Sequence, residues 1–264
     1  RGYLEDHGIS SLFTHQSQTA NRAHEGEDVV VSTGTSSGKS LGYLLPILSD
    51  LAADPTACAL YLTPTKALGS DQLQAVSALT RSIEGLNTVH PAPYEARSGI
   101  RYTSRFVFTN PDMLHVSLLA HHQRWARLLR RLRYIVVDEC HTYRGVFGAH
   151  VALALRRLLR MAEHYGSVPT VILASATAND PAAHAANLLG RPVTAVTEDG
   201  APTGARTVLM WEPGFLDGVE GENGAPVRRA AATEAAGIMA TFVAEGARTL
   251  TFVRSRRSAE LVAL

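Results

Sequence analysis

The feature that most constrains the fold is a series of short, continuous apolar runs alternating with helix-like patterns. The runs are rich in Val, Ile and Leu, and we expect them to be strands at 28–33, 59–63, 106–109, 134–138 and 170–174. Strands that are apolar at every position are typical of a parallel sheet covered on both faces. We expect helices between them at 39–53, 70–84, 112–119, 123–131 and 149–164. The pattern predicts an α/β fold in which helices cover both faces of a parallel sheet.

The composition favours a folded protein. The chain has 264 residues, of which 45% are hydrophobic and 19% charged, and this balance is not that of a disordered chain. No segment approaches the ~20 uninterrupted apolar residues of a membrane helix. Cys58 and Cys140 cannot build a disulfide framework, and no signal peptide opens the chain, so we expect a cytoplasmic location. The 11 histidines show no metal-ligand spacing, and we assign no zinc.

The charges are unevenly distributed. The formal net charge is only +1, which gives no general attraction to nucleic acid. Among 25 basic residues, two are lysines, Lys39 and Lys66, and the rest are arginines. These lysines either mark places where a compact ammonium matters or reflect chance. An arginine run is either a DNA-facing stripe or, as we favour, the solvated face of a helix with a buried opposite face. It consists of Arg124, Arg127, Arg130, Arg131 and Arg133, around Trp125.

The C-terminal part differs in pattern from the rest. We expect residues 1–205 to form one domain and residues 206–264 to form the incomplete beginning of a second. In the second part we expect strands at 207–211 and 249–253, a helix at 227–245, a mobile loop at 214–226 and a helix at 258–264. Because the chain begins at Arg1 and ends within an expected helix, we expect it to be part of a longer protein. In the first part, Pro46 predicts a kink or an end of the first helix beyond Leu45.

A phosphate-binding loop follows the first expected strand. Residues 33–40 read TGTSSGKS, which matches the pattern GxxxxGK[ST] except that Thr33 replaces the first Gly. Successive backbone N–H groups of Thr35, Ser36, Ser37 and Gly38 are expected to face phosphate oxygens at a helix N-terminus. Lys39 would reach the β and γ phosphates, and the Ser40 hydroxyl would bind Mg²⁺. The alternative is a strand–turn–helix junction built from small residues.

Two carboxylates end the fourth expected strand. Asp138 and Glu139 follow the apolar run 134–137. We expect Asp138 to hold Mg²⁺, and Glu139 to polarise the attacking water as general base. The alternative is a helix-capping or surface acid pair. Cys140 is expected to be a small buried hydrophobe.

Taken together, these motifs resemble superfamily-two helicases of the DExH type. The loop at 33–40 is similar to motif I, residues 138–141 (DECH) to motif II and residues 175–177 (SAT) to motif III. Residues 64–68 (PTKAL) are similar to motif Ia, 109–112 (TNPD) to motif Ib and 252–256 to motif IV. Within this class the segments 34–41, 109–115 and 141–148 resemble the YprA-like bacterial DNA helicases, a group that includes SftH and the mitomycin repair factor A.

The resemblance implies a fold and a set of roles. It implies a RecA-like first domain that binds ATP and Mg²⁺, with Gln16 reading adenine. It implies that His141, Ser175 and Thr177 couple the γ-phosphate site to motif III. Backbone contacts with nucleic acid would come from Thr65, Lys66, Thr109, Asn110 and Asp112, although residues 110–112 also read as a turn with a helix cap. Ser36 stands where many relatives have Gly.

The resemblance also implies a complete activity that extends beyond this chain. The expected activity is ATP-dependent 3′-to-5′ translocation on single-stranded DNA, in DNA repair. The expected partners are single-stranded or partly duplex DNA, the rest of a second RecA-like domain with its arginine finger, and a distal four-cysteine zinc domain. The alternatives are an RNA helicase, a nucleotide-gated clamp that does not unwind, and a P-loop kinase or small-molecule ATPase. The motifs contact phosphates, so they do not distinguish DNA from RNA, for which the 2′-hydroxyl is the discriminator.

Overall fold

The computed structural model describes residues 8–83, 85–93 and 104–263. The chain divides into two compact units, Arg1–Thr203 and Gly204–Leu264. Glu84 and Leu264, which end two of the expected helices, lie outside the described residues.

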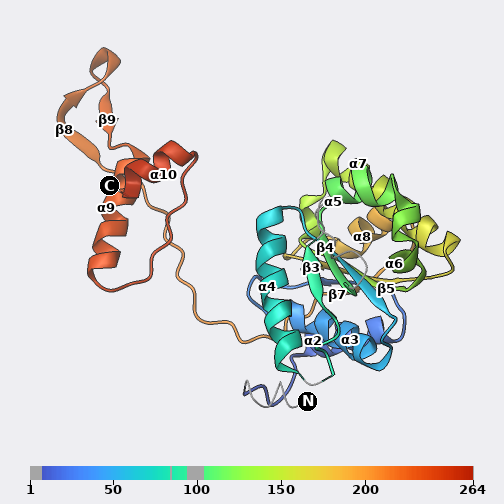
Figure 1. The fold of residues 1–264 in the computed structure, drawn as a ribbon. Helices are drawn as coiled ribbons and strands as arrows, with labels where there is room; N and C mark the ends of the chain where they lie inside the picture. The colour runs from blue at the N-terminus through green and yellow to red at the C-terminus, as the bar shows by residue number, and fades with distance from the viewer. Residues whose placement is uncertain (1–7, 84, 94–103, 264) are drawn as a thin grey trace. The chain divides into compact units, whose positions relative to one another are not determined.

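The first unit is built on a parallel sheet of seven strands (Figure 1), in the order β3-β4-β2-β5-β6-β1-β7. The strands are β1 (Val29–Ser32), β2 (Cys58–Leu62), β3 (Pro91–Pro93), β4 (Phe106–Thr109), β5 (Leu132–Val137), β6 (Thr170–Ser175) and β7 (Thr194–Val196). All five expected strands are present, each displaced by at most two residues at either end. The sequence analysis missed β3 and β7, which are three-residue strands at the two edges of the sheet and too short to give an apolar run.

Helices and helical turns fill the connections. They are α2 (Thr14–His24), α3 (Lys39–Ala53), α4 (Lys66–Ser82), α5 (Pro111–Met113), η2 (Leu114–Leu119), η3 (His122–Trp125), α6 (Ala126–Arg130), η4 (Cys140–Thr142), α7 (Gly145–His164) and α8 (Pro181–Leu189). The segment expected as one helix at 112–119 is a short α-helix followed by the π-helical turn η2. The segment at 123–131 is likewise divided, into the 3₁₀ turn η3 and α6. The helices α2 and α8 were not expected.

The helix expected at 39–53 is α3, with the same bounds. It continues through Pro46 to Ala53, so the proline does not end it. Its apolar side, with Tyr43, Ile47 and Leu51, is at most 1% exposed. Helix α2 packs so closely that a Cβ at Gly42 would lie 3.2–3.4 Å from Thr19 and Gln16. The free energy gained by burying this side of the helix therefore outweighs the loss of one helix hydrogen bond at the proline, which has no N–H.

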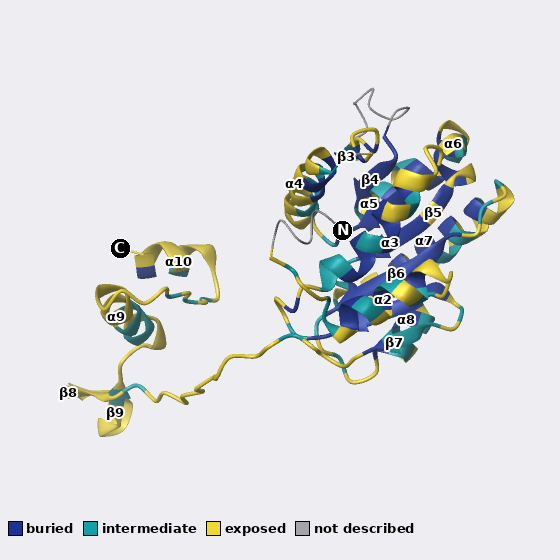
Figure 2. Ribbon diagram, turned by 90° about the horizontal axis from the view of Figure 1, so that it is seen from below, coloured by how far each residue is buried: buried dark blue, intermediate teal, exposed yellow. Residues whose placement is uncertain are grey.

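Two hydrophobic layers lie on opposite faces of the sheet, and Figure 2 shows the strands between them coloured as buried. Consecutive residues of a strand contribute to opposite layers: Val29 and Val31 belong to one and Val30 to the other. Residues of α2, α3 and α4 complete the first layer, and those of η2, α6, α7 and α8 complete the second. Because all seven strands of this sheet are parallel, their carboxyl ends share one edge, where ligands of such sheets bind.

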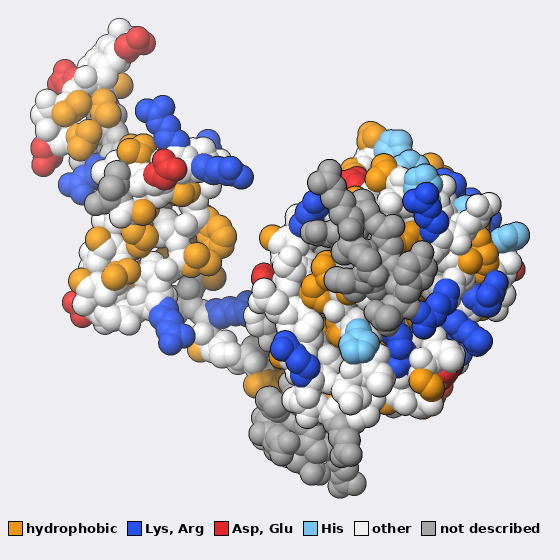
Figure 3. Space-filling view, viewed as in Figure 1, with side chains coloured by type: hydrophobic (Ala, Val, Ile, Leu, Met, Phe, Trp, Pro, Cys, Tyr) orange, Lys and Arg blue, Asp and Glu red, His pale blue; other side chains and the backbone are white. Residues whose placement is uncertain are grey.

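The second unit contains an antiparallel hairpin and two helices. Its elements are β8 (Phe215–Glu220), η5 (Glu222–Gly224), β9 (Pro226–Arg228), α9 (Ala231–Ala244) and α10 (Arg256–Ala263). The mobile loop expected at 214–226 is instead this hairpin, in which the Arg228 guanidinium lies 4.1 Å from the centre of the Phe215 ring. The strands expected at 207–211 and 249–253 are not formed. Large side chains of those segments are exposed, and Figure 3 shows the hydrophobic side chains on the surface of this unit.

Candidate functional site

The phosphate loop joins β1 to α3 and contains two residues with left-handed backbone. Ser36 has φ +61° and Gly38 has φ +78°, a region in which glycine alone is unstrained. Gly38 is also required sterically, because a Cβ there would lie 2.7 Å from Gln16 Nε2. Thr35 and Ser36 are exposed, whereas Ser37 is buried and its hydroxyl lies 2.7 Å from Thr33 Oγ1. The hydroxyl of Thr33, where the pattern has Gly, thus supports the loop from inside.

Lys39 folds back over this loop. Its Nζ donates to the carbonyl oxygens of Gly34 at 2.7 Å and Thr33 at 3.2 Å. The ammonium is therefore held at the centre of the turn whose N–H groups are expected to bind phosphate. Carbonyl oxygens are weaker partners than phosphate oxygens for an ammonium, so the same side chain can exchange them for an anion.

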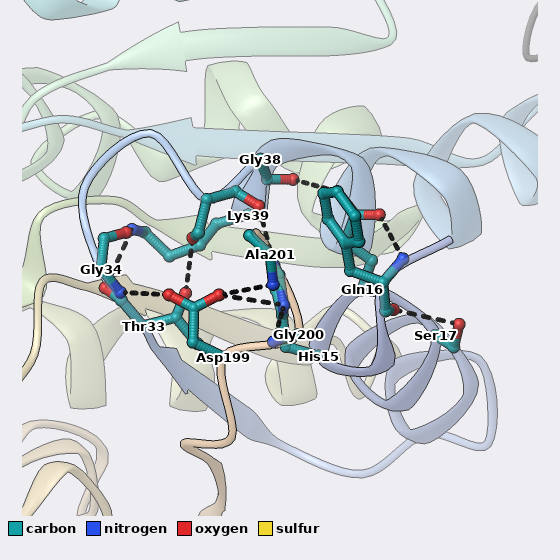
Figure 4. A network of polar contacts seen from close by, with 12 residues as sticks. His15, Gln16, Ser17, Thr33, Gly34, Gly38, Lys39, Asp199, Gly200 and Ala201 are labelled. Atoms are coloured by element: carbon teal, nitrogen blue, oxygen red, sulfur yellow. Dashed lines mark hydrogen bonds and ion pairs between the residues drawn. The ribbon is translucent and has the colours of Figure 1, made fainter. Parts of the chain in front are cut away.

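Two residues of α2 contact the loop from outside, as Figure 4 shows. Gln16 Nε2 donates to the carbonyl oxygen of Gly38 at 2.9 Å, and Gln16 Oε1 accepts from Phe13 N–H at 3.0 Å. His15 Nε2 lies 3.0 Å from the carbonyl oxygen of Ser37. Gln16, which the resemblance implies as the adenine reader, is 3% exposed and its amide group is bonded at both ends in this structure.

Asp199 and Gly200 complete this network from the segment after β7, and the sequence analysis missed both. Asp199 Oδ2 accepts from Gly34 N–H at 3.0 Å, and Gly200 N–H donates to His15 Nδ1 at 3.3 Å. His15 Nδ1 also lies 3.7 Å from Asp199 Oδ1. The N–H of Ala201 bonds Asp199 and lowers the pKa of that carboxyl, with further lowering by Gly34, His15 and Lys39. Gly34 and Asp199 are separated by 165 positions in the sequence, which explains why no local motif signalled the contact.

The two predicted carboxylates lie at the end of β5. Asp138 Oδ1 accepts from Glu139 N–H at 2.9 Å, and its Oδ2 accepts from the Tyr61 hydroxyl at 2.7 Å. Burial raises the pKa of Asp138, while the Tyr61 bond and Lys39 lower it. Glu139 has a left-handed backbone with φ +49°, a strained conformation of the kind found at functional sites. Beside it, Cys140 is buried as predicted, and burial raises its pKa to about 12.

Of the predicted coupling residues, His141 lies between Glu139 and the segment that carries Ser175 and Thr177. Its Nδ1 lies 3.4 Å from Glu139 Oε2 and 3.3 Å from the backbone N of Ala176, between Ser175 and Thr177. One ring nitrogen carries either a proton or a lone pair, so it donates to Glu139 or accepts from Ala176, but not both. Two further contacts tie these segments together: Ser32 Oγ donates to the Ala176 carbonyl at 2.9 Å, and His184 Nε2 lies 2.9 Å from the Cys140 carbonyl oxygen. Thr177 is exposed, and Ser175 is buried.

The residues predicted to contact nucleic acid lie at the ends of β2 and β4. Lys66, Thr109 and Asn110 line one small pocket, together with Thr63, Gly69, Ser70, Leu73, Pro93 and Phe108. Thr65 caps α4 by accepting from Leu68 N–H at 3.4 Å, and Asn110 caps α5 by accepting from Met113 N–H at 2.9 Å. Asp112 lies apart from them, in a neighbouring pocket lined by α7.

The arginine run lies elsewhere. All five arginines are exposed, whereas Trp125, Leu128, Leu129 and Leu132 are buried. This is the solvated helix face that we favoured. Since α6 directly precedes the first residue of β5, the run lies toward the amino end of that strand, away from the carboxyl-end edge that carries the predicted site.

The side chains at this edge suit a magnesium–nucleotide complex. The Ser40 hydroxyl and the Asp138 carboxylate offer hard oxygen ligands, and Mg²⁺ is commonly held by one or two protein ligands together with substrate phosphates. Within residues 8–83, 85–93 and 104–263, no three His, Cys, Asp or Glu side chains gather as a closed metal site would require. In the same described part of the chain, no helix is long and apolar enough to cross a membrane.

Comparison with known proteins identifies the class. The family described as DEAD/DEAH box helicase matches residues 13–185, and the chain belongs to this family. The sequence is 38% identical over 263 residues to the uncharacterized ATP-dependent helicase YprA of Bacillus subtilis, covering 98% of this chain and 34% of that protein. It is also 38% identical over 261 residues to the ATP-dependent helicase HRQ1 of Saccharomyces cerevisiae, covering 96% and 24% respectively.

Solved structures of helicases have the same fold as this chain. The fold matches the DUF1998 helicase MrfA bound to DNA with a TM-score of 0.88 and 37% identity, over 99% of this chain and 37% of that one. MrfA bound to DNA and AMPPNP gives a TM-score of 0.88 and 38% identity, over 98% of this chain and 36% of that one. The resemblance to the YprA-like helicases and the RecA-like fold are therefore confirmed. The chain spans about a third of the length of YprA and MrfA.

Proposed function

We propose that this chain is the ATP-binding part of an ATP-dependent DNA helicase or translocase. The observation that carries the proposal is the single sheet edge on which the phosphate loop, the acid pair and the Lys66–Asn110 pocket all lie. A nucleotide site and a nucleic-acid site on one rigid sheet are what a nucleic-acid-driven ATPase needs. The relatives described as ATP-dependent helicases, and the MrfA structure described as bound to DNA, support the choice of DNA.

In this proposal the chain's own residues bind and orient the nucleotide. The N–H groups of Thr35, Ser36, Ser37 and Gly38 face the phosphates, and Lys39 leaves its two carbonyl partners for phosphate oxygens. Ser40 and Asp138 hold Mg²⁺, which neutralises phosphate charge when it is bound. Gln16, which the family resemblance implies as the adenine-reading residue, keeps its hydrogen bond to Gly38. This bond connects the adenine end of the site to the phosphate loop.

Glu139 acts as the general base that takes the proton of the attacking water. His141 Nδ1 can bond either Glu139 or the Ala176 N–H, but not both at once. A change in the protonation of Glu139 therefore changes the bond between His141 and Ala176. Through this contact the segment with Ser175 and Thr177 follows events at the γ-phosphate.

The nucleic-acid contacts are proposed at Thr65, Lys66, Thr109, Asn110 and Asp112. Backbone N–H groups and hydroxyls at helix starts bind phosphates without reading bases, so capping and binding are compatible roles. From the family resemblance we further propose 3′-to-5′ movement on single-stranded DNA, a role in DNA repair and a cytoplasmic location. We also propose that residues 206–264 begin a second RecA-like domain, close to the observed division after Thr203.

The test is the ATPase rate of the complete protein with single-stranded DNA and with RNA of the same sequence. We expect DNA to stimulate hydrolysis more strongly, and Glu139→Gln to lower the rate by about 10²–10⁴-fold, the usual contribution of a general base. Glu163→Gln, at an exposed position of α7, is the matched control. Equal or greater stimulation by RNA would favour the RNA helicase, and stimulation without strand separation would favour the clamp. An active Glu139→Gln protein would refute the assignment of the base.

A further inference from the structure

Two buried tyrosines connect the two side chains to which we assign the magnesium ion. The Tyr43 hydroxyl lies 3.1 Å from Ser40 Oγ and 2.8 Å from the Tyr61 hydroxyl, which donates to Asp138 Oδ2 at 2.7 Å. Tyr43 is 1% exposed and Tyr61 is 0% exposed. Four side chains from α3, β2 and the end of β5 thus form one unbroken hydrogen-bonded chain.

The surroundings of these tyrosines are otherwise apolar. The Tyr61 ring stacks on Phe108 with 4.9 Å between centroids and meets the Tyr43 ring edge-on at 5.9 Å. Phenylalanine would satisfy the same packing, and a buried hydroxyl is costly unless it is hydrogen-bonded. The packing therefore does not account for the two hydroxyls, whereas the polar chain from Ser40 to Asp138 does.

Each tyrosine hydroxyl holds one of the two side chains to which we assign the magnesium ion. Tyr61 donates to Asp138 Oδ2, and Tyr43 donates to Ser40 Oγ. The 2.8 Å contact between the two hydroxyls links these bonds, so the position of each tyrosine depends on the other.

We propose that Tyr43 and Tyr61 are positioning residues of the magnesium site, which hold the Ser40 hydroxyl and the Asp138 carboxylate in their metal-binding orientations. The proposal rests on the proposed function, since that function assigns Ser40 and Asp138 to Mg²⁺. Neither tyrosine needs to touch the ion or the nucleotide. Partners that orient metal ligands in this way typically change metal affinity by about 10–100-fold when they are removed.

The experiment measures binding of a fluorescent ATP analogue to the 264-residue chain, first in EDTA and then across a magnesium titration. We expect Tyr61→Phe to raise the magnesium concentration at half-effect by about tenfold or more, while the affinity in EDTA stays unchanged. Tyr43→Phe should act in the same direction but less strongly, because it lies one bond further from the carboxylate. The double variant should lose little more than Tyr61→Phe alone, because one break already interrupts the chain.

Tyr134→Phe is the matched control. Tyr134 also donates to a carboxylate, Asp50 Oδ2 at 2.8 Å, but it does so away from the site. An unchanged magnesium midpoint in both site variants, or an equal shift in Tyr134→Phe, would overturn the proposal. If Tyr61→Phe does not fold, Tyr43→Phe alone decides in the same way. A wild-type chain that binds no nucleotide, or binds it without regard to magnesium, would instead refute the proposed function, so the two failures are distinguishable.

Discussion

The two halves of the functional edge are built differently, although they belong to one sheet. At the nucleotide half, after β1, β5 and β6, polar side chains are bonded to partners far away in the sequence: Asp199 to Gly34 and Tyr61 to Asp138. At the predicted nucleic-acid half, after β2 and β4, the side chains of Thr65 and Asn110 bond the first turns of their own helices. Lys66 and Asp112 are exposed there.

This difference matches the chemistry proposed for each half. Hydrolysis requires a metal ligand, a base and a phosphate loop in fixed mutual positions, and hydrogen bonds between distant parts of the sequence help to fix them. Contacts with a phosphate backbone need only donors in roughly the right place, and helix caps and flexible side chains provide these. We therefore expect single substitutions in the nucleotide half to change nucleotide binding or hydrolysis strongly. Single substitutions in the nucleic-acid half should each weaken DNA binding only by a small amount.

The strongest test of the comparison is Lys39→Ala. Removal of the ammonium should weaken nucleotide binding by about 10–100-fold, as expected for loss of a charge-assisted hydrogen bond of ~1.5–3 kcal/mol. Titration calorimetry with ATP and Mg²⁺ measures it. Lys66→Ala is the control, since it removes the same group from the other half. If both variants bound nucleotide equally well, the two halves would not be functionally separate.

Lys66→Ala should have the next largest effect, on nucleic acid. We expect binding of single-stranded DNA to weaken a few-fold for every sequence, and the slope of log affinity against log salt to fall by up to ~1 unit. Fluorescence anisotropy at several salt concentrations measures both. Arg130→Ala, an exposed charge of α6, should leave the slope unchanged. A sequence-dependent loss would indicate base contacts instead.

The same contrast explains what could be predicted from the sequence. Motifs within one strand–turn–helix segment, such as residues 33–40 and 138–141, carry their signal locally, and the parallel sheet follows from its continuous apolar strands. The positions of His15, Asp199 and Tyr61 depend on which strands become neighbours, and no local pattern encodes that. In the second unit, the apolar residues 249–253 suggested a strand, but a strand needs a partner as well as a propensity. The Gly-rich segment 214–226 forms a hairpin because its glycines suit tight turns.

Asp199→Asn tests the long-range bonds of the nucleotide half through pH. The pKa of Asp199 is lowered in the folded chain, chiefly by its bond from Ala201 N–H, so its contribution to stability is fully present above the ordinary carboxyl pKa. That contribution is lost as the pH falls from about 4 through the lower folded pKa. Because this carboxylate is exposed and screened by solvent, we expect the wild type to be more stable than the variant by less than about 1 kcal/mol at neutral pH, with the difference closing in acid. Urea unfolding measures it, and Asp71→Asn, at an exposed position of α4, should show no such closing. A difference independent of pH would mean that the charge of Asp199 plays no part.

The smallest expected effect is that of Ser36→Gly in the phosphate loop. Ser36 has a left-handed backbone, with φ +61°, which costs a residue with a Cβ about 1–2 kcal/mol. Glycine removes this strain but loses about 0.5–1 kcal/mol through its freedom in the unfolded chain, so we expect a net gain in stability of about 0.5 kcal/mol. Thr35→Gly, next to it, lacks a left-handed backbone and should destabilise the chain instead.

Thermal unfolding of the two variants with and without nucleotide decides between two explanations of Ser36. If Ser36→Gly gains stability in both conditions, the strain is a local cost of the loop sequence. If it gains stability only without nucleotide, the strain is relieved when phosphate binds, and the loop of the free chain is not yet in its binding conformation.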